Sequence, residues 1–280
     1  MDIAVVLKCS DDFRIFRCIK SIPPDVEIVC SITSNPLIEN GLKKLGIPYC
    51  ITPKGNLSVT INAGISLAKS NNIIIMDSDS YFGDGAIQSL YEALKENIVV
   101  RGRLIFLYNT SLNRVIAELR DYVNQQPVAY APGLAFRREI LSYIGGYFFS
   151  PYIPWAVDAA FTYRIEEAGI RVKIVPNAII YHDSISLYHD LRAAFRIGGG
   201  KRLIVELTGK YNKEDISPTI INLLNGKFIK EGIHILKHKG VKVLLYNFLW
   251  NIVYYIGYYT TRFKTFINKL LAKLSICNPL

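Results

Sequence analysis

Short apolar runs alternate with amphipathic stretches along the first hundred residues of the chain. The β-branched runs predict four strands, at residues 3–7, 26–32, 47–51 and 73–76. The last run, IIIM, has no polar position, and such a strand is covered on both faces. The intervening stretches predict helices over residues 11–22, 36–45 and 56–69. This alternation predicts an α/β fold with a doubly wound, mostly parallel sheet.

The second half of the chain mixes strands and helices less regularly. The patterns predict strands at residues 98–108, 172–175 and 178–181, and helices over 112–126 and 155–168. Residues 131–139 lead from a turn through a strand into a helix. We therefore expect a Rossmann-like sheet that is mostly parallel but mixed, with helices on its flanks.

Two carboxylates directly follow the fourth predicted strand. Asp77 and Asp79 flank Ser78 at this point, and open parallel sheets bind ligands beyond the carboxyl ends of their strands. Acids at such an edge gain nothing from packing and must be solvated or bound to a metal ion. The alternative is an ordinary helix cap or turn, because Asp84 and Gly85 follow closely.

Four motifs follow one another along roughly residues 1–185. They are Gly55 with Asn62-Ala63-Gly64; Asp77-Ser78-Asp79; Pro132–Glu139 with Ile144-Gly145-Gly146-Tyr147; and Val157-Asp158 followed by Arg164, Gly169, Pro176 and His182. In this order they resemble the motifs of family 2 glycosyltransferases, which have the GT-A fold. The resemblance implies a GT-A catalytic domain, which we place at residues 1–200.

The resemblance also implies an inverting transfer of a sugar from a nucleotide-diphosphate donor. Asp79, Asp77 and His182 would bind Mg²⁺ or Mn²⁺, which neutralises the charge that develops on the departing diphosphate. Asp158 would be the general base that deprotonates the acceptor hydroxyl. Taken alone, Asp158 can equally be an acid favoured by the helix dipole, and His182 a polar residue at a packed strand end. The remaining expected donor contacts are Ser78, Asn62, Asp11, Thr33, Arg196 and Lys201.

Nucleobase recognition departs from the family pattern. The family usually has an acid in the loop after the second strand, whereas residues 31–35 contain no carboxylate. Recognition of the base is therefore assigned to Asp11, Asp12, residues 33–35 or backbone groups. The residue before Asp158 is a valine rather than the usual Glu.

Three consecutive glycines, Gly198–Gly200, lie among basic residues. A loop of exposed amides beside cations can bind phosphate, so Arg196 and Lys201 are expected to contact the donor. The alternative is a flexible hinge before the C-terminal segment.

Positive charge is concentrated near the C-terminus. The chain has 33 Lys and Arg against 23 Asp and Glu, a net charge of +10, and from Gly226 onward it has nine basic residues and one acid, Glu231. The most apolar window, residues 241–260, contains a wetter face. That face comprises Asn247, Asn251, Tyr255, Tyr258 and Arg262. The pattern favours a helix in the membrane interface over a spanning one. A packed helical hairpin and an oligomer contact are the alternatives.

The function expected from these features is that of an inverting, metal-dependent glycosyltransferase on the cytoplasmic face of a membrane. Its acceptor would be a lipid-linked or membrane-proximal glycan, and residues 201–280 would form a basic, helical, membrane-associating extension. A non-catalytic nucleotide- or glycan-binding module with the same fold is the alternative function. Five cysteines without a C-x-x-C pair indicate a reducing compartment, and no signal peptide or nucleic-acid partner is expected.

Overall fold

The computed structural model describes residues 1–209 and 226–276, which form two compact units. The first unit comprises Met1–Thr110 and Arg120–Ser184, and the second comprises Ser111–Leu119 and Ile185–Leu280. The boundary expected at residue 200 falls inside helix α8 (Leu187–Thr208), and the units divide earlier, at Ser184. Residues 210–225 and 277–280 of the expected C-terminal segment lie outside the described residues.

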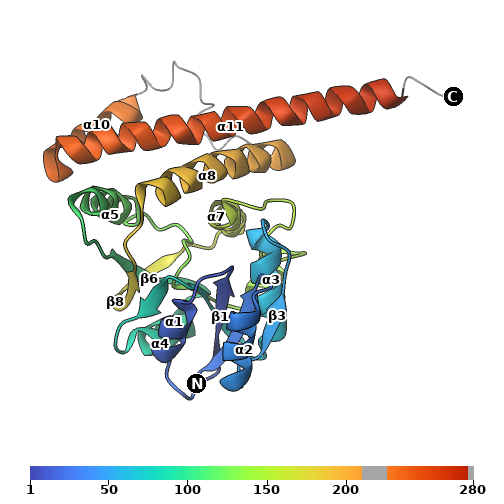
Figure 1. Ribbon diagram of the computed structural model, residues 1–280, viewed down its shortest axis with the longest axis vertical. Coiled ribbons are helices and arrows are strands. Elements are labelled where there is room, and N and C mark those ends of the chain that lie inside the picture. Colours follow the sequence, from blue (N-terminus) through green and yellow to red (C-terminus); the bar gives the residue numbers. More distant parts are fainter. Residues whose placement is uncertain (210–225, 277–280) are drawn as a thin grey trace. The chain divides into compact units, whose positions relative to one another are not determined.

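A mixed eight-stranded sheet forms the centre of the first unit (Figure 1). In spatial order the strands are β3 (Tyr49–Ile51), β2 (Glu27–Ile32), β1 (Ile3–Cys9), β4 (Asn72–Asp77), β7 (Leu134–Arg137), β6 (Val99–Phe106), β8 (Lys173–His182) and β5 (Ser80–Phe82). Strands β3, β2, β1 and β4 are parallel, β7 is antiparallel to β4 and β6, and β8 is parallel to β6. The predicted mostly parallel, mixed sheet is therefore confirmed.

Helices of the first unit flank this sheet. They are α1 (Ile15–Lys20), α2 (Pro36–Lys44), α3 (Leu57–Leu67), α4 (Ala86–Glu96), α6 (Ile140–Ile144) and α7 (Val157–Glu167). Helix α5 (Ser111–Val123) begins in the second unit and ends in the first. Asparagine side chains cap two of the helices: Asn35 accepts hydrogen bonds from the first turn of α2, and Asn56 accepts one from the first turn of α3.

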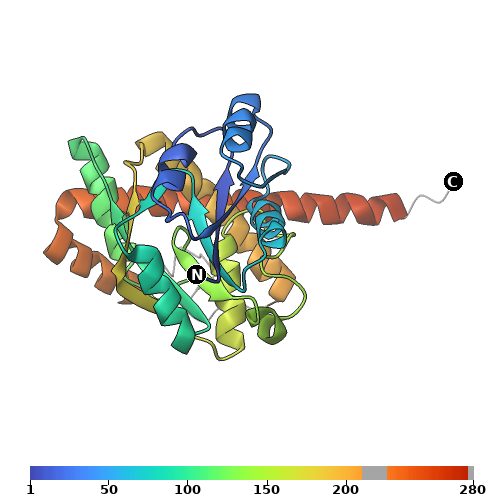
Figure 2. The same cartoon turned by 90° about the horizontal axis from the view of Figure 1, so that it is seen from below.

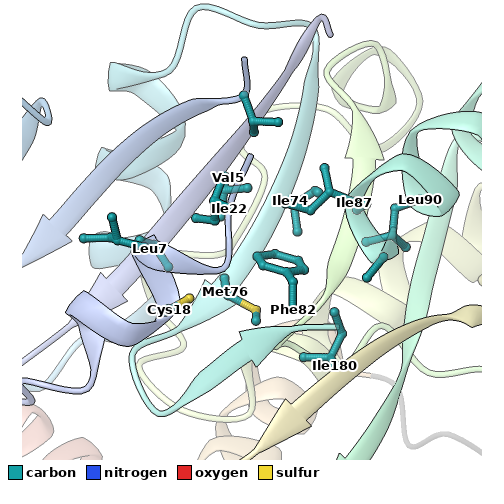
Figure 3. Packing of buried hydrophobic residues seen from close by; sticks show 14 of the residues in the cluster. Val5, Leu7, Cys18, Ile22, Ile74, Met76, Phe82, Ile87, Leu90 and Ile180 are labelled. Atoms are coloured by element: carbon teal, nitrogen blue, oxygen red, sulfur yellow. The ribbon is translucent and has the colours of Figure 1, made fainter. Parts of the chain in front are cut away.

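Two apolar clusters cover the two faces of the sheet. One includes Leu7, Met76 and Phe82, whose side chains pack together in Figure 3. The other includes Ile75 and, from α7, Phe161. Successive side chains of a strand point to opposite faces, so β4 contributes Met76 to one cluster and Ile75 to the other. This arrangement explains why the fourth predicted strand has no polar position.

Strand β8 joins two segments that the sequence pattern separates. Residues 173–175 and 178–181 of the two predicted segments belong to one strand, whose pairing with β6 shifts register opposite Gly102 and Arg103. Pro176 has no N–H to donate to the sheet, which accounts for the interruption. Strand β5, which the sequence pattern did not predict, pairs antiparallel with the end of β8.

The second unit contains α8, α10 (Gly226–Lys239) and α11 (Val241–Ile276). Helix α8 lies against α11 in Figure 1 and crosses it in Figure 2. The prediction of a glycine loop is wrong, because Gly198–Gly200 lie within α8. An added Cβ at Gly198 would collide with the carbonyl oxygen of Tyr254, and one at Gly257 would collide with that of Phe195. The glycines therefore allow two helix backbones to approach closely.

Replacing Gly198 with alanine should destabilise this helix crossing. The added methyl group forces the backbones apart, and overpacking of this kind costs roughly 1–3 kcal/mol. This cost exceeds the roughly 0.5–1 kcal/mol that alanine gains over glycine in a helix. Urea unfolding of the full chain, followed by circular dichroism, measures the effect. Gly232 in α10 is the matched control, since an added Cβ there meets its nearest atom, Leu244 Cδ1, at 3.6 Å. Gly232→Ala should leave stability unchanged or raise it, and equal losses in both variants would contradict the interpretation.

Candidate active site

Segments that are distant in the sequence meet at the carboxyl edge of the sheet. Strands β1, β2 and β4 end there because they are parallel, and β8 runs in the same direction through β6 and β7. The backbone N–H of Asp183 donates a 3.0 Å hydrogen bond to the carbonyl oxygen of Asp79. This bond joins the D-x-D segment to the end of β8, next to His182.

Asp79 and His182 face each other at this edge. His182 Nε2 lies 3.5 Å from Asp79 Oδ1, and His182 Nδ1 lies 2.7 Å from the carbonyl oxygen of Asp183. A carbonyl oxygen only accepts, so Nδ1 carries a hydrogen and donates it to Asp183. This arrangement leaves Nε2 and the Asp79 carboxylate facing each other, and both are groups that can bind one metal ion.

This pair fits a divalent cation. Imidazole nitrogen and carboxylate oxygen are both established ligands of Mn²⁺-type ions, and a backbone carbonyl on the second ring nitrogen is the usual support for a ligating histidine. Among the described residues there is no cluster of three or more His, Cys, Asp or Glu suited to a metal. The other ligands would therefore be diphosphate oxygens and water, as Mg²⁺ commonly has.

Asp77 occupies a different environment from Asp79. Its Oδ1 forms an ion pair with Nζ of Lys8, which lies beside it on the neighbouring strand β1. Both side chains are largely buried, with 12% of Lys8 and 22% of Asp77 exposed. The structure thus gives Asp77 a lysine partner, and its expected role as a metal ligand remains a prediction.

Arg14 lies among three carboxylates. Its Nη2 is 2.7 Å from Asp12 Oδ2 and 3.8 Å from Asp79 Oδ2, and its Nη1 is 3.2 Å from Asp183 Oδ2. Arg17 also binds Asp183, at 2.6 Å. Burial alone would raise the pKa of Asp12, but the hydrogen bonds from Arg14 outweigh it and lower this pKa. Asp12 therefore stays ionised.

Sequence reasoning missed the basic residues Lys8, Arg14 and Arg17. The available signal was their position, because they follow the first predicted strand on either side of two aspartates. Cations placed next to a carboxylate edge are expected wherever several acids must remain charged together.

Asp158 lies in the first turn of α7, where its Oδ1 accepts a 2.9 Å hydrogen bond from the N–H of Ala159. Burial raises the pKa of Asp158; Lys8 lowers it and Asp77 raises it further. Asp158 is therefore within electrostatic reach of the Lys8–Asp77 pair, although its side chain keeps partial exposure. A carboxyl whose pKa lies above the ordinary value is a better proton acceptor. The coupling to Asp77 indicates that Asp158 lies near the start of the D-x-D segment.

Three of the expected donor contacts lie at the same edge. Thr33 Oγ1 and Ser10 Oγ are 3.0 Å apart and link the loops after β1 and β2, while Ser78 Oγ lies 3.4 Å from Asp12 Oδ2. Asp11 is exposed and pairs with Lys54 at 3.7 Å. Polar groups from the loops after three strands thus line the edge.

Both polar groups of the Asn62 side-chain amide form hydrogen bonds with the backbone of one residue, Phe149. Its Nδ2 donates to the carbonyl oxygen of Phe149 at 2.6 Å, and its Oδ1 accepts from the N–H of Phe149 at 3.0 Å. Asn56 and Ser58 on the same helix bind the backbone of Pro151 and Ile153. Helix α3 thus anchors the segment that leads to Asp158, and a direct contact of Asn62 with the donor remains a prediction.

Arg196 and Lys201 lie on α8 in the second unit. The loop geometry that suggested their contact with the diphosphate does not exist, because this stretch is helical. Their contact with the donor remains a prediction without that support.

The fold and the edge carboxylates resemble those of glycosyltransferases with the GT-A fold. Residues 23–144 match the family described as glycosyl transferase family 2. The match confirms the resemblance over this segment, which is less than half of the chain. No curated protein matches the chain in sequence.

Solved structures of S. aureus TarS share the fold. TarS 1–349 in complex with UDP-GlcNAc aligns with a TM-score of 0.52 and 14% identity, covering 94% of this chain and 92% of that one. A second TarS structure aligns with a TM-score of 0.51 and 13% identity, covering 93% of this chain and 55% of that one. The chain therefore spans about half the length of the second TarS chain. At this identity the likeness concerns the fold alone.

Replacing Asp158 with asparagine should stabilise the chain at neutral pH. Because the folded-state pKa is raised, folded Asp158 holds its proton at pH values where the unfolded chain has lost it. Stability therefore falls as pH rises from 3.8, the ordinary value, through the raised pKa, and the cost persists above it. Asparagine can keep the hydrogen bond to Ala159 without carrying charge, so a midpoint of thermal unfolding a few degrees higher is expected at pH 7.

The gain in stability should shrink as pH falls through this window. Asp84→Asn is the matched control, because Asp84 is exposed and its replacement should give no comparable gain. A lower unfolding midpoint for Asp158→Asn at pH 7 would show that the buried charge is not a cost.

Proposed function

We propose that the chain is an inverting, metal-dependent glycosyltransferase that moves a sugar from a nucleotide-diphosphate donor to a lipid-linked or membrane-proximal glycan. We place it on the cytoplasmic face of the membrane, as a peripheral or monotopic protein. The observations that support the proposal are that Asp79 and His182 face each other at one edge of the sheet and that Asp158 is electrostatically coupled to Lys8 and Asp77. The UDP-GlcNAc complex of TarS supports a nucleotide-sugar donor.

Asp79 and His182 are the residues that would hold Mg²⁺ or Mn²⁺. When bound, the ion supplies positive charge that stabilises the departing diphosphate. Lys8, Arg14 and Arg17 add fixed positive charge of the chain itself around the same carboxylates. Asp77 orients Lys8 in this scheme, as well as adding its own negative charge near the ion.

Asp158 accepts the proton of the acceptor hydroxyl in the proposed reaction. The acceptor oxygen attacks the anomeric carbon of the sugar as the bond from that carbon to the diphosphate oxygen breaks, which inverts the configuration. The proton passes from the hydroxyl to the Asp158 carboxylate, whose raised pKa favours the transfer. The nucleobase would lie near Asp11 and Thr33, where the loops after β1 and β2 meet.

Two substitutions should separate binding from catalysis. Asp158→Asn should lower sugar transfer, and slow hydrolysis of the donor, by about a hundredfold or more while nucleotide binding persists. Asp79→Asn should lower both the reaction and the Mn²⁺-dependent binding of nucleotide, the latter by roughly tenfold. Calorimetry with nucleotide, with and without Mn²⁺, and assay of released sugar measure the two effects. Asp84→Asn is the control and should behave like the wild type. Normal turnover in either test variant would remove its assigned role.

Arg14→Gln should affect the metal and the nucleotide in opposite directions. Removing the guanidinium frees Asp79, Asp12 and Asp183 of a competing cation, so Mn²⁺ alone should bind more tightly, by roughly two- to fivefold. The diphosphate loses a positive partner, so the nucleotide should bind more weakly. Calorimetric titration with Mn²⁺ and then with nucleotide tests both signs, and Arg171→Gln on the exposed surface is the control. Weaker binding of both ligands would contradict this role of Arg14.

The second candidate function is a non-catalytic nucleotide- or glycan-binding module. The loop after β2, which has no carboxylate, and the lysine partner of Asp77 favour it. A module would bind nucleotide without releasing free sugar from any nucleotide-sugar in the presence of Mn²⁺. Metal-dependent release of sugar that is lost in Asp158→Asn would exclude it.

A further inference from the structure

Helix α11 turns a row of large apolar side chains outward. The exposed residues recur at spacings of three or four and so share one side of the helix: Val241, Leu245, Phe248, Leu249, Ile252, Ile256 and Tyr259. Each of them is at least 40% exposed, and Leu245 reaches 64%. We call this row the outer face of α11.

The opposite side of α11 is covered and contains its polar groups. Tyr246 donates a 2.5 Å hydrogen bond from Oη to Asp190 Oδ2 on α8, and both residues are buried. Asn247 and Tyr258 are also buried, with 6% and 5% exposed. The sequence pattern treated these last two as part of a solvent-facing side, and the structure corrects this expectation. The helix hides its polar side and exposes its apolar side.

Such a reversed arrangement is unfavourable in water. Leucine, isoleucine and phenylalanine side chains gain free energy when they leave water, and single soluble chains rarely expose long contiguous apolar rows. Helix α10, which packs against α11, repeats the pattern with Ile229, Ile233 and Leu236 exposed. The outer face of α11 therefore requires an apolar partner.

The charges on these helices indicate what the partner is. Lys230, Lys237, Lys242 and Arg262 are exposed, and Glu231 is the single acid between Gly226 and Arg262. Pairing with a second copy of the chain would bring these cations together, whereas an anionic lipid surface supplies both apolar chains and negative charge. None of the described helices is long and apolar enough to cross a membrane. An orientation within the membrane plane is consistent with these features.

We infer that the outer face of α11, with the exposed row of α10, lies in the interface of an anionic lipid bilayer. The apolar side chains enter the boundary between headgroups and acyl chains, and the flanking lysines remain at the headgroups. The inference deepens the proposed function. It rests on that function only for the claim that the acceptor lies at the membrane. The surface itself is argued from α10 and α11 alone.

Flotation of the full chain with lipid vesicles tests the inference. The wild type should float with phosphatidylcholine vesicles that contain phosphatidylglycerol, and much less with phosphatidylcholine alone. The double variant Phe248→Asn/Ile252→Asn should lower binding at least about tenfold. Replacing Lys237 or Lys242 with glutamine should lower binding to the anionic vesicles by about fivefold each. Unfolding midpoints should be unchanged, because all four side chains are exposed.

The matched control is Leu37→Asn/Leu45→Asn. These two residues belong to the region of α2 and are exposed by 68% and 55%, so the change removes similar apolar surface elsewhere. The control should bind vesicles like the wild type. Loss of binding in the control, or its retention in Phe248→Asn/Ile252→Asn, would overturn the inference.

Light scattering distinguishes a second copy from lipid as the partner. A wild type that forms dimers, becomes monomeric in Phe248→Asn/Ile252→Asn and floats with neither kind of vesicle would identify the outer face as a dimer contact and overturn the inference. Nucleotide binding measured on the same preparations separates this failure from a failure of the proposed function. A chain that binds nucleotide with Mn²⁺ but not vesicles refutes the lipid surface alone.

Discussion

Several carboxylates crowd one edge of the sheet, and their mutual repulsion is the constraint on which the rest of the site depends. Lys8, Arg14 and Arg17 form ion pairs with the four aspartates at this edge, which are Asp12, Asp77, Asp79 and Asp183. Asp158 differs from them, because burial raises its pKa above the ordinary value. The fold therefore gives similar residues different surroundings: basic side chains pair with one group of acids, and burial makes Asp158 a better proton acceptor.

The architecture of the first unit could be predicted because its signals are local. The all-apolar run before Asp77 identified a strand covered on both faces, and the alternation of strands and helices gave the parallel part of the sheet. The placement of Asp77, Asp79 and His182 at one edge followed from strand direction alone. The partners of these acids could not be predicted, because the ion pairs of Lys8 and Arg14 depend on the spacing of strands and loops in three dimensions.

Two expectations failed for reasons of packing. Three glycines in a row favour a loop, because glycine has a low helix propensity. Gly198 nevertheless lies in helix α8, and it is glycine because the backbone of α11 passes too close for a side chain. Periodicity along α11 identified two unlike sides correctly, but it could not say which side would be covered. Tyr246 is buried because it binds Asp190 of α8, where glycines let the two helices approach closely, and Phe248 is exposed. Solvent preference alone predicts the reverse.

Asn62 shows how a motif residue can hold another segment of a ligand site in place. Both of its polar groups are committed to the backbone of Phe149, in the segment that precedes α7 and Asp158. Replacing Asn62 with leucine would therefore remove the hydrogen bonds that hold the segment around Phe149 in place. Asp158 would then lose its fixed position, while the polar groups that line the donor site stayed unchanged. The resulting defect would resemble the loss of the proton acceptor itself. A sequence motif associated with sugar transfer can thus identify a residue whose role is to hold another segment in position.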